Sequence, residues 1–264
     1  MLNSLAKIVI EASHLMQTEN FSISQKHGNA DIVTSSDLAV QDYLRHHLGT
    51  LLPGCGFICE EEDRHDTEHD FLWIVDPIDG TANYSRGIRE CAVCTGLLHG
   101  RTMEMAAIYL PRTDELFTAK RGEGAYLQLP HSDQPARQIH VSGRPFADAI
   151  MCTALPVYHK EYASICSEII RETFLRCNDI RRFGSAASEL CYLATGRCEL
   201  YFEYLLSPWD FAAASLILEE AGGLLCNLEG LPLDYTQPSG ILAANNQANL
   251  NRLVEITQHK RQLT

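Results

Sequence analysis

The 264-residue sequence contains no apolar run of about 18 or more residues, the length that a helix needs to cross a bilayer. Its first twenty residues also lack the apolar segment of a secretory signal peptide, because Glu11 and His14 interrupt the residues around Ile8-Val-Ile10. From these two absences we expect a cytoplasmic protein without a membrane segment.

Basic residues are scarce. There are 21 Lys and Arg against 34 Asp and Glu, so the formal net charge is −13, and no basic run is found. An acidic chain repels phosphate backbones and anionic lipid headgroups. We therefore expect no direct binding to nucleic acid or to a membrane surface, and partners that are cations or that are anions bound through cations.

Internal repeats, low-complexity segments and a regular cysteine spacing are also absent. The chain has ten cysteines, but it is long enough to bury a core without disulfides. The closest pair, Cys91 and Cys94, falls in an apolar run that predicts a buried strand, and residues three apart on a strand face opposite sides. A zinc or redox Cys-x-x-Cys site is therefore not expected.

The hydrophobic pattern predicts an α+β protein, with an antiparallel first part over residues 1–140 and a more α/β-like second part over 141–264. The boundary is the polar stretch 130–145. In the first part we predict a helix within residues 1–20, a helix that follows Ser35-Ser36-Asp37 and runs toward Leu48, strands at 57–58, 71–75, 92–98 and 105–110, and a hairpin at 115–127. In the second part we predict strands near 150, before 183, at 200–204 and at 241–244, and helices at 161–176, at 186–194 and after 207.

The segment Trp73-Ile-Val-Asp-Pro-Ile-Asp-Gly-Thr81 carries the clearest chemical signal. An apolar strand leads into Asp76, Asp79 and the Ile78 carbonyl, and oxygen ligands of this kind select Mg²⁺, Mn²⁺ or Ca²⁺ over zinc. If a helix starts at Gly80-Thr81, its free N–H groups face an anion beside the cation. The alternative is a plain turn, in which Asp-Pro and Asp-Gly are turn formers and Thr81 is a helix cap.

Three further acidic positions have both a structural and a functional interpretation. Glu60 begins the acidic run 60–63 directly after a short apolar strand and is the member of that run expected to turn inward. Asp210 follows Ser207-Pro-Trp in capping-box position, so it could cap a helix or reach a metal beyond the helix end. Asp37 ends the segment Asp31-Ile-Val-Thr-Ser-Ser-Asp37 and precedes a helix that it could cap.

Two other classes are excluded by spacing. Phosphatases with an aspartyl nucleophile carry Asp-x-Asp-Gly-Thr, whereas Asp76 and Asp79 are three residues apart. An EF-hand with Gly80 at the sixth loop position would place Val75, which has no side-chain oxygen, at the first.

The four acidic segments, in this order and at these separations, resemble the inositol monophosphatase family of Mg²⁺-dependent, lithium-sensitive phosphatases. The resemblance runs from residue 31 to beyond residue 223 and rests mainly on Trp-x-Val-Asp-Pro-Ile-Asp-Gly-Thr and the later Trp-Asp-x-Ala-Ala. It implies a layered αβαβα sandwich of the sugar phosphatase type and a homodimer.

The resemblance also implies the roles of individual residues. Glu60, Asp76 and the Ile78 carbonyl would bind a first Mg²⁺, for which Mn²⁺ could substitute. Asp76, Asp79 and Asp210 would bind a second, and a third, weaker ion would depend on Glu60 through water. Thr81 and Asp37 would orient and deprotonate the attacking water, with Glu60 as a further catalytic residue. The N–H groups of Gly80 and Thr81 would hold the phosphate.

The substrate would be a small phosphomonoester such as inositol monophosphate or a similar polyol or sugar phosphate. Glu203 aligns with a family glutamate that accepts from inositol hydroxyls, although the spacing also allows an outward residue on an edge strand. The polyol pocket would be lined by Gly184, Ser185 and Ala186, with either Arg181 or Arg182 orienting the site. Fructose-1,6-bisphosphatase, histidinol-phosphatase and 3′-nucleotidase activities, and a non-catalytic interaction protein on the same fold, remain alternatives.

The sequence departs from the family pattern at two positions. Cys59 and Ala214 stand where the family often has glycine or serine, and glycine, respectively. Both residues are small, so they concern packing near the motifs and leave the metal chemistry unchanged.

Overall fold

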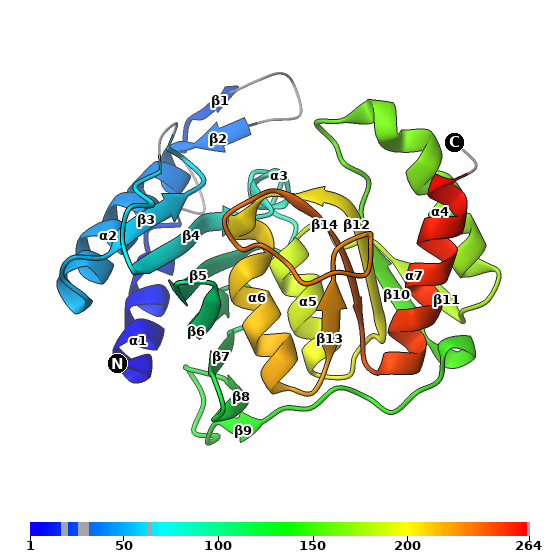
Figure 1. Ribbon diagram of the computed structural model, residues 1–264. Coiled ribbons are helices and arrows are strands. Elements are labelled where there is room, and N and C mark those ends of the chain that lie inside the picture. Colours follow the sequence, from blue (N-terminus) through cyan, green and yellow to red (C-terminus); the bar gives the residue numbers. More distant parts are fainter. Residues whose placement is uncertain (17–20, 26–31, 63–64, 263–264) are drawn as a thin grey trace.

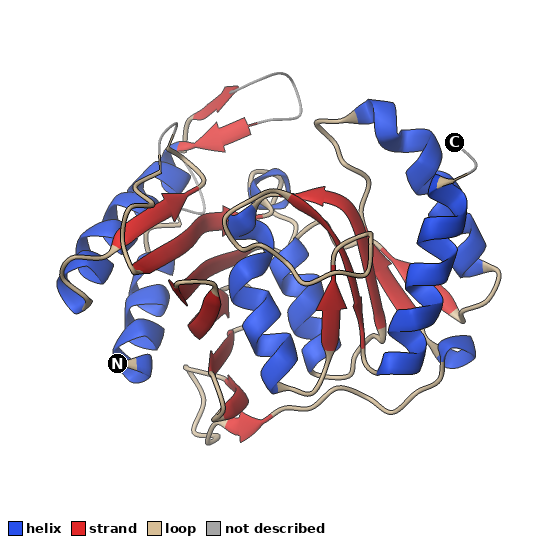
Figure 2. Cartoon of the chain, in the orientation of Figure 1, coloured by secondary structure: helices blue, strands red, loops and turns tan. Residues whose placement is uncertain are grey.

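The computed structural model describes residues 1–16, 21–25, 32–62 and 65–262, and these residues form five alternating layers of helices and sheets (Figures 1 and 2). From one side to the other, the layers are helices α1 and α2, a seven-stranded sheet, helices α5 and α6, a five-stranded sheet, and helices α4 and α7. This αβαβα arrangement confirms the predicted fold class.

The seven-stranded sheet has the order β3-β4-β5-β6-β7-β8-β9, and only the β3–β4 pair is parallel. Its strands are β3 (Gly56–Cys59), β4 (Phe71–Asp79), β5 (Ala92–His99), β6 (Thr102–Leu110), β7 (Glu115–Lys120), β8 (Gly124–Gln128) and β9 (Arg137–Gln138). The outer helices α1 (Leu2–Ser13) and α2 (Ser35–Leu51) place Leu5 and Leu44 against Trp73 of β4, all fully buried. Apolar residues at helical spacing therefore cover this face of the sheet.

The five-stranded sheet has the order β11-β10-β12-β14-β13, in which β11, β10 and β12 run parallel. Its strands are β10 (Ile150–Thr153), β11 (Asp179–Arg181), β12 (Leu200–Leu206), β13 (Leu224–Cys226) and β14 (Ser239–Ala244). Its outer face packs on α4 (Ala163–Phe174) and α7 (Gln247–Arg261). The smaller elements are β1 (Ile23–Gln25), β2 (Ile32–Thr34), α3 (Thr81–Tyr84) and the 3₁₀ turns η1 (Phe146–Asp148) and η2 (Lys160–Tyr162).

Helices α5 (Ala186–Ala194) and α6 (Pro208–Glu220) form the middle layer, with a sheet on each side. α6 is apolar on all faces, and its Phe211, Leu216 and Ile217 are fully buried. A helix without a polar face is stable only where packing surrounds it. The sequence pattern of α6 therefore already specifies a central position.

Most of the predicted elements are confirmed, with small differences at their ends. β4 extends past Val75 to Asp79, and the helix expected at 161–176 begins as η2 and ends at Phe174. α2 begins at Ser35, ahead of the predicted start after Asp37, because Thr34 is its N-cap. The predictions did not include β1, β2, β9, β13 or α7. The division into parts 1–140 and 141–264 stays a prediction.

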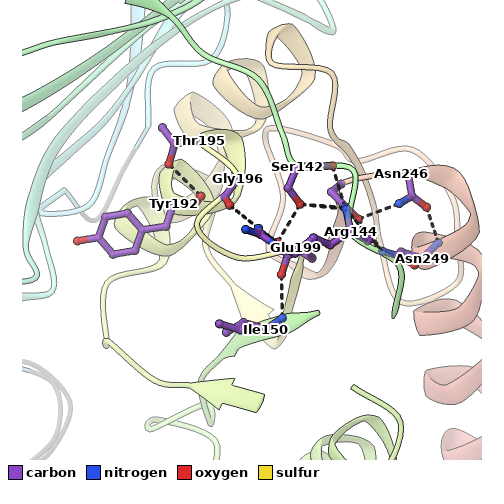
Figure 3. A network of polar contacts seen from close by, with 10 residues as sticks. Ser142, Arg144, Ile150, Tyr192, Thr195, Gly196, Glu199, Asn246 and Asn249 are labelled. Atoms are coloured by element: carbon purple, nitrogen blue, oxygen red, sulfur yellow. Dashed lines mark hydrogen bonds and ion pairs between the residues drawn. The ribbon is translucent and has the colours of Figure 1, made fainter. Parts of the chain in front are cut away.

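A buried glutamate fixes the segment that connects the two sheets (Figure 3). Glu199 Oε1 accepts hydrogen bonds from Ser142 Oγ and Arg144 Nη1, both at 2.8 Å, and Oε2 accepts one from Ile150 N, also at 2.8 Å. Glu199 itself is 1% exposed. The connecting segment is thus tied to the starts of β10 and β12.

Most of the cysteines lie in the interior of the fold. All ten cysteines are free thiols. Cys91 directly precedes β5 and Cys94 lies within it, and the two buried residues pack into different clusters. Within the described residues, none of the helices combines the length and the apolar character that crossing a membrane requires.

Candidate functional site

A β-bulge brings two aspartates to one side of β4. Residues three apart on a regular strand face opposite sides. In β4, however, Asp76 lies opposite Cys94 and Asp79 opposite Ala92, so the register against β5 shifts by one residue between them. The extra residue rotates the strand, which is the usual effect of a bulge. The carboxylates of Asp76 and Asp79 thereby meet that of Asp210, with one oxygen of each lying within 4.8 Å of the others.

Asp210 comes from the first turn of α6. Ser207 is the N-cap and Pro208 follows it, and the backbone N–H of Ser207 donates to Asp210 Oδ2 at 2.7 Å. The predicted capping box is therefore present. It does not compete with a metal role, because it holds the carboxylate at the helix end that faces Asp76 and Asp79.

Asp79 is held in place from the middle layer. Its Oδ2 accepts from Ser185 Oγ at 2.5 Å and from Ala187 N at 2.8 Å, at the start of α5. Ser185 was expected among the residues that line the substrate pocket. It does line the cavity, and its hydroxyl contacts the aspartate.

The three carboxylates form a site of unfavourable negative charge. Burial, followed by repulsion from neighbouring acids, raises the pKa values of Asp76 and Asp210 well above their usual range. Burial raises the pKa of Asp79 to about 6, against the hydrogen bonds from Ser185 and Ala187 that lower it. Asp76 Oδ1 is buried without a hydrogen-bond partner among the described residues. Such oxygen donors fit a hard divalent cation, which would neutralise the cluster.

Glu60 and Ile78, the other two expected metal ligands, lie at the same cavity. Glu60 follows β3, where its N–H donates to Val75 O at 3.2 Å, and its charge contributes to the raised pKa values of Asp76 and Asp210. The Ile78 carbonyl accepts from Thr81 Oγ1 at 3.0 Å. Asp63, at the end of the same acidic run, lies outside the described residues.

Asp37 and Thr81 make direct contact across 44 positions of sequence. Thr81 Oγ1 donates to Asp37 Oδ1 at 3.0 Å, and Asp37 Oδ2 accepts from the N–H and the hydroxyl of Thr34 at 2.8 and 2.5 Å. Asp37 is thus the third residue of the α2 capping box and contacts Thr81 at the same time. Burial is the main cause of its raised pKa.

Gly80 allows the close turn between β4 and α3. Its φ is +88°, a left-handed conformation that favours glycine. A Cβ atom there would lie 2.9 Å from the Glu90 carbonyl and 3.2 Å from that of Gly184. Glycine therefore lets this turn pack closely against the backbone of Glu90 and Gly184, and both Gly80 and Thr81 line the cavity.

The cavity that holds these groups has a volume of about 1100 Å³ and extends from the aspartates to the segment 154–160. It is lined by the carboxylates of Glu60, Asp76, Asp79, Glu189, Glu203 and Asp210, the cationic side chains of Arg86, Lys160 and Arg182, and the small residues Gly184, Ser185 and Ala186, among others.

Glu203 lies on the inner strand β12 and is 8% exposed, so the interpretation as an outward residue on an edge strand is wrong. Its Oε2 accepts from the Tyr201 hydroxyl at 2.6 Å, and burial raises its pKa to about 7. Arg182 lines the cavity, whereas Arg181 points elsewhere and pairs with Asp179. Arg182 is therefore the arginine that the structure places at the site.

Sequence reasoning missed two residues that shape the site. Glu189 Oε1 accepts from the N–H groups of Phe183 and Gly184 at 2.6 and 2.9 Å, and burial raises the pKa of Glu189 to about 8. Asn83 Nδ2 donates to the carbonyls of Phe183 and Glu90, both at 2.7 Å. The sequence did contain signals for both residues. Glu189 is an acid within the apolar helix α5, and Asn83 is an amide two residues after Thr81.

Comparison with known proteins agrees with this geometry. The family model described as the inositol monophosphatase family matches residues 2–262. "Nus factor SuhB" of Salmonella typhimurium is 38% identical over 224 residues, which cover 84% of this chain and 80% of that protein. "Inositol-1-monophosphatase" of Mesorhizobium japonicum is 32% identical over 254 residues, which cover 93% and 91%. The solved structure of extragenic suppressor protein suhB from Bartonella henselae matches with a TM-score of 0.86 at 30% identity, covering 97% of each chain. The chain belongs to the inositol monophosphatase family.

Proposed function

We propose that this chain is a Mg²⁺-dependent phosphomonoesterase that hydrolyses inositol monophosphate or a similar polyol or sugar phosphate. The observation that carries the proposal is the convergence of Asp76, Asp79 and Asp210 within 4.8 Å beside the Thr81–Asp37 hydrogen bond. A structural turn needs neither three carboxylates gathered within 4.8 Å, two of them on buried residues, nor a buried oxygen without a partner.

In this proposal the acidic residues hold the divalent cations that the reaction needs. Glu60, Asp76 and the Ile78 carbonyl form one ligand set, and Asp76, Asp79 and Asp210 form the other. Bound Mg²⁺ would neutralise the phosphate dianion, lower the pKa of water and stabilise the departing alkoxide. Ser185 and Ala187 orient Asp79, and the Ser207 N–H orients Asp210.

Thr81 and Asp37 provide the proton path. The Thr81 hydroxyl, held by Asp37 Oδ1 and the Ile78 carbonyl at 3.0 Å each, accepts a hydrogen bond from the attacking water while donating its own proton toward Asp37. The raised pKa of Asp37 suits a residue that receives a proton. Gly80 and Thr81 offer their N–H groups to the phosphate, and water attacks in line without a phosphoenzyme intermediate.

Glu203 is proposed to recognise the alcohol part of the substrate. A buried carboxylate can accept from two adjacent hydroxyls, as polyols offer, and it suits a nucleotide 3′-phosphate poorly. The name of the Mesorhizobium relative points to the same substrate class. Hydrolysis of fructose 1,6-bisphosphate, histidinol phosphate or a nucleotide 3′-phosphate is the alternative for the same site.

The remaining properties carried by the family resemblance are inhibition by Li⁺, a homodimeric state and a cytoplasmic location. Size-exclusion chromatography with light scattering tests the dimer. Mn²⁺ is expected to substitute for Mg²⁺, since both prefer oxygen ligands.

The experiment is phosphate release from a panel of phosphomonoesters with Mg²⁺, with and without Li⁺. We expect turnover that Li⁺ inhibits, and a loss of about 100-fold or more in Asp79→Asn. Asp133→Asn, on an exposed loop outside the cavity, is the matched control and should keep full activity. Turnover that persists in Asp79→Asn would contradict the metal assignment.

A non-catalytic interaction protein is the second candidate, because the Salmonella relative is named a Nus factor. The preserved Thr81–Asp37 contact argues against it, since a binding module does not need that pair. Absence of turnover on every substrate of the panel would favour this candidate.

A further inference from the structure

The cavity extends well beyond the space next to the aspartates. At about 1100 Å³ it exceeds the roughly 300–1,000 Å³ typical of pockets for drug-sized ligands. Part of it lies over the carboxyl ends of the parallel strands β11, β10 and β12, where ligands of α/β sheets commonly bind. Arg182 follows β11 and the segment 154–160 follows β10. Glu203 lies in the middle of β12, just past Phe202, which pairs with the last residue of β10.

Two cations in this part of the cavity lack an acidic partner. No carboxylate of the described residues lies within 4.0 Å of Arg182 Nη or Nε atoms or of Lys160 Nζ, whereas most other Lys and Arg side chains in that part of the chain are paired, as Arg181 is with Asp179. In a chain of net charge −13, acids to pair with them are abundant. Two unpaired cations at one cavity edge therefore favour an anionic ligand.

The position of Arg182 links this edge to the alcohol side of the site. In the sheet, Cys152 of β10 lies between Arg181 of β11 and Tyr201 of β12. Arg182 and Glu203, which come shortly after these two partners, therefore lie on either side of the end of β10. The charge of Arg182 also lowers the pKa of Glu203, which indicates that the two side chains are near each other. Arg86, the third cation of the cavity, donates instead to the Ala82 carbonyl at 2.9 Å, on the α3 side where the phosphate is proposed to bind.

We propose that Arg182 and Lys160 form a subsite for a second anionic group, a phosphate or a carboxylate, on the alcohol part of the substrate. This rests on the proposed phosphatase function and narrows its substrate class to phosphomonoesters that carry another negative charge. The polyol hydroxyls face Glu203 while the second anion lies beyond it, toward the segment 154–160. Guanidinium and ammonium groups both form charge-assisted hydrogen bonds with such anions.

The test compares two pairs of substrates that differ in the second anion. Inositol 1-phosphate against inositol 1,4-bisphosphate tests a phosphate, and glycerol 2-phosphate against 2-phosphoglycerate tests a carboxylate. In at least one pair, we expect kcat/KM to be about tenfold or more higher for the substrate that carries the second anionic group, mainly through a lower KM. The double variant Arg182→Ala/Lys160→Ala should lose this advantage, so that kcat/KM differs by less than about twofold between the two members of each pair.

The control variant is Arg137→Ala, which removes an exposed cation of β9 that does not line the cavity, and it should keep the advantage. No advantage in either pair, or an advantage that survives in the double variant, would overturn the subsite. If no substrate is hydrolysed, the phosphatase proposal fails, and calorimetry with inositol 1,4-bisphosphate decides the subsite separately. Binding that weakens in the double variant supports it, and absence of binding overturns it.

Discussion

Asn83 joins the two halves of the site through a single amide group. Its Nδ2 donates to the carbonyls of Glu90, in the first half, and of Phe183, in the second. We predict that Asn83→Asp, which places an oxygen against those two carbonyls, lowers the free energy of unfolding by about 2–4 kcal/mol. It should also lower kcat by about tenfold or more at a temperature where the variant is folded, because the Phe183–Gly184 turn that flanks Gly80 moves.

The measurements are denaturant unfolding and steady-state kinetics on the same preparations. Asn246→Asp, at the start of α7 and remote from the cavity, is the control for changing a structural amide into an acid. Wild-type kcat in folded Asn83→Asp would show that the turn does not need this amide.

Glu203 gives a prediction about pH. Burial raises its pKa to about 7, so the carboxylate is protonated below this pH and becomes a full acceptor for hydroxyls above it. The ratio of kcat/KM for inositol 1-phosphate to that for phenyl phosphate, which offers no hydroxyls, should therefore rise several-fold between about pH 6 and 8. Taking the ratio cancels titrations that affect both substrates.

Glu203→Gln supplies the comparison for this measurement. The variant cannot ionise, so its ratio should stay flat with pH. A wild-type ratio that is independent of pH, or a variant ratio that still rises, would contradict the role of Glu203 in binding the polyol.

At the scale of elements, the sequence predicted helices and strands best where hydrophobic periodicity or a helix-capping motif within a short segment defines them. The Ser207–Asp210 box that begins α6 was predicted from its short motif. At the start of α2 the sequence predicted a cap at Asp37, whereas Thr34 is the N-cap and Asp37 is the third helical residue. The bulge in β4 was not readable, because it exists only in the register against β5. α7 has too polar a sequence to give a clear apolar stripe. The choice between Arg181 and Arg182 also needed the structure, in which Arg181 ends β11 and pairs with Asp179 while Arg182 follows the strand and lines the cavity.

The segment between the sheets leads to a prediction about stability. Glu199→Ala removes the acceptor of the Ile150 N–H and of Ser142 and Arg144, leaving a backbone donor unsatisfied. We expect a loss of about 2–4 kcal/mol in the free energy of unfolding. The ion pair with Arg144 should contribute only a small part of this loss, because the Arg144 side chain is about half exposed. Chemical denaturation measures it.

The control for this variant is Arg181→Ala, which breaks an exposed ion pair with Asp179. Exposed pairs contribute about 0–1 kcal/mol, so little change is expected, and phosphatase activity should also persist because Arg181 does not line the cavity. Equal losses in the two variants would show that the Glu199 network has no special part in joining the sheets.

For the whole molecule, the site depends on all the central layers at once. Asp76 and Asp79 belong to the seven-stranded sheet, Asp210 to the middle helices and Glu203 to the five-stranded sheet. The sequence motifs predicted that these residues act together, but only the packing of two sheets on α5 and α6 brings them into one cavity. Folding therefore brings acidic residues from distant segments close together. Their mutual repulsion lowers the free energy of unfolding of the metal-free protein.

This repulsion predicts how stability responds to pH and to Mg²⁺. The pKa of Asp79 is raised from 3.8 to about 6, and those of Asp76 and Asp210 are also raised well above their usual range, so the folded state binds these protons more tightly than the unfolded chain does. Without divalent cations, stability should be greatest below the unfolded pKa values and should fall as the pH rises through about 6. Mg²⁺ binds the ionised carboxylates and reverses the loss.

We therefore expect Mg²⁺ at about 100 times its Kd to add about 2.7 kcal/mol at pH 7.5, which corresponds to a rise in Tm of roughly 5–10 °C. At pH 5 the rise should be smaller, because protons compete for the same oxygens. Differential scanning calorimetry at both pH values measures it, with Na⁺ at equal ionic strength as the control. Asp79→Asn should reduce both the pH dependence of the metal-free protein and the Mg²⁺ effect, since it removes one of the three mutually repelling charges and one ligand together. An equal Mg²⁺ effect at the two pH values, or in the variant and the wild type, would mean that the ion acts outside this cluster.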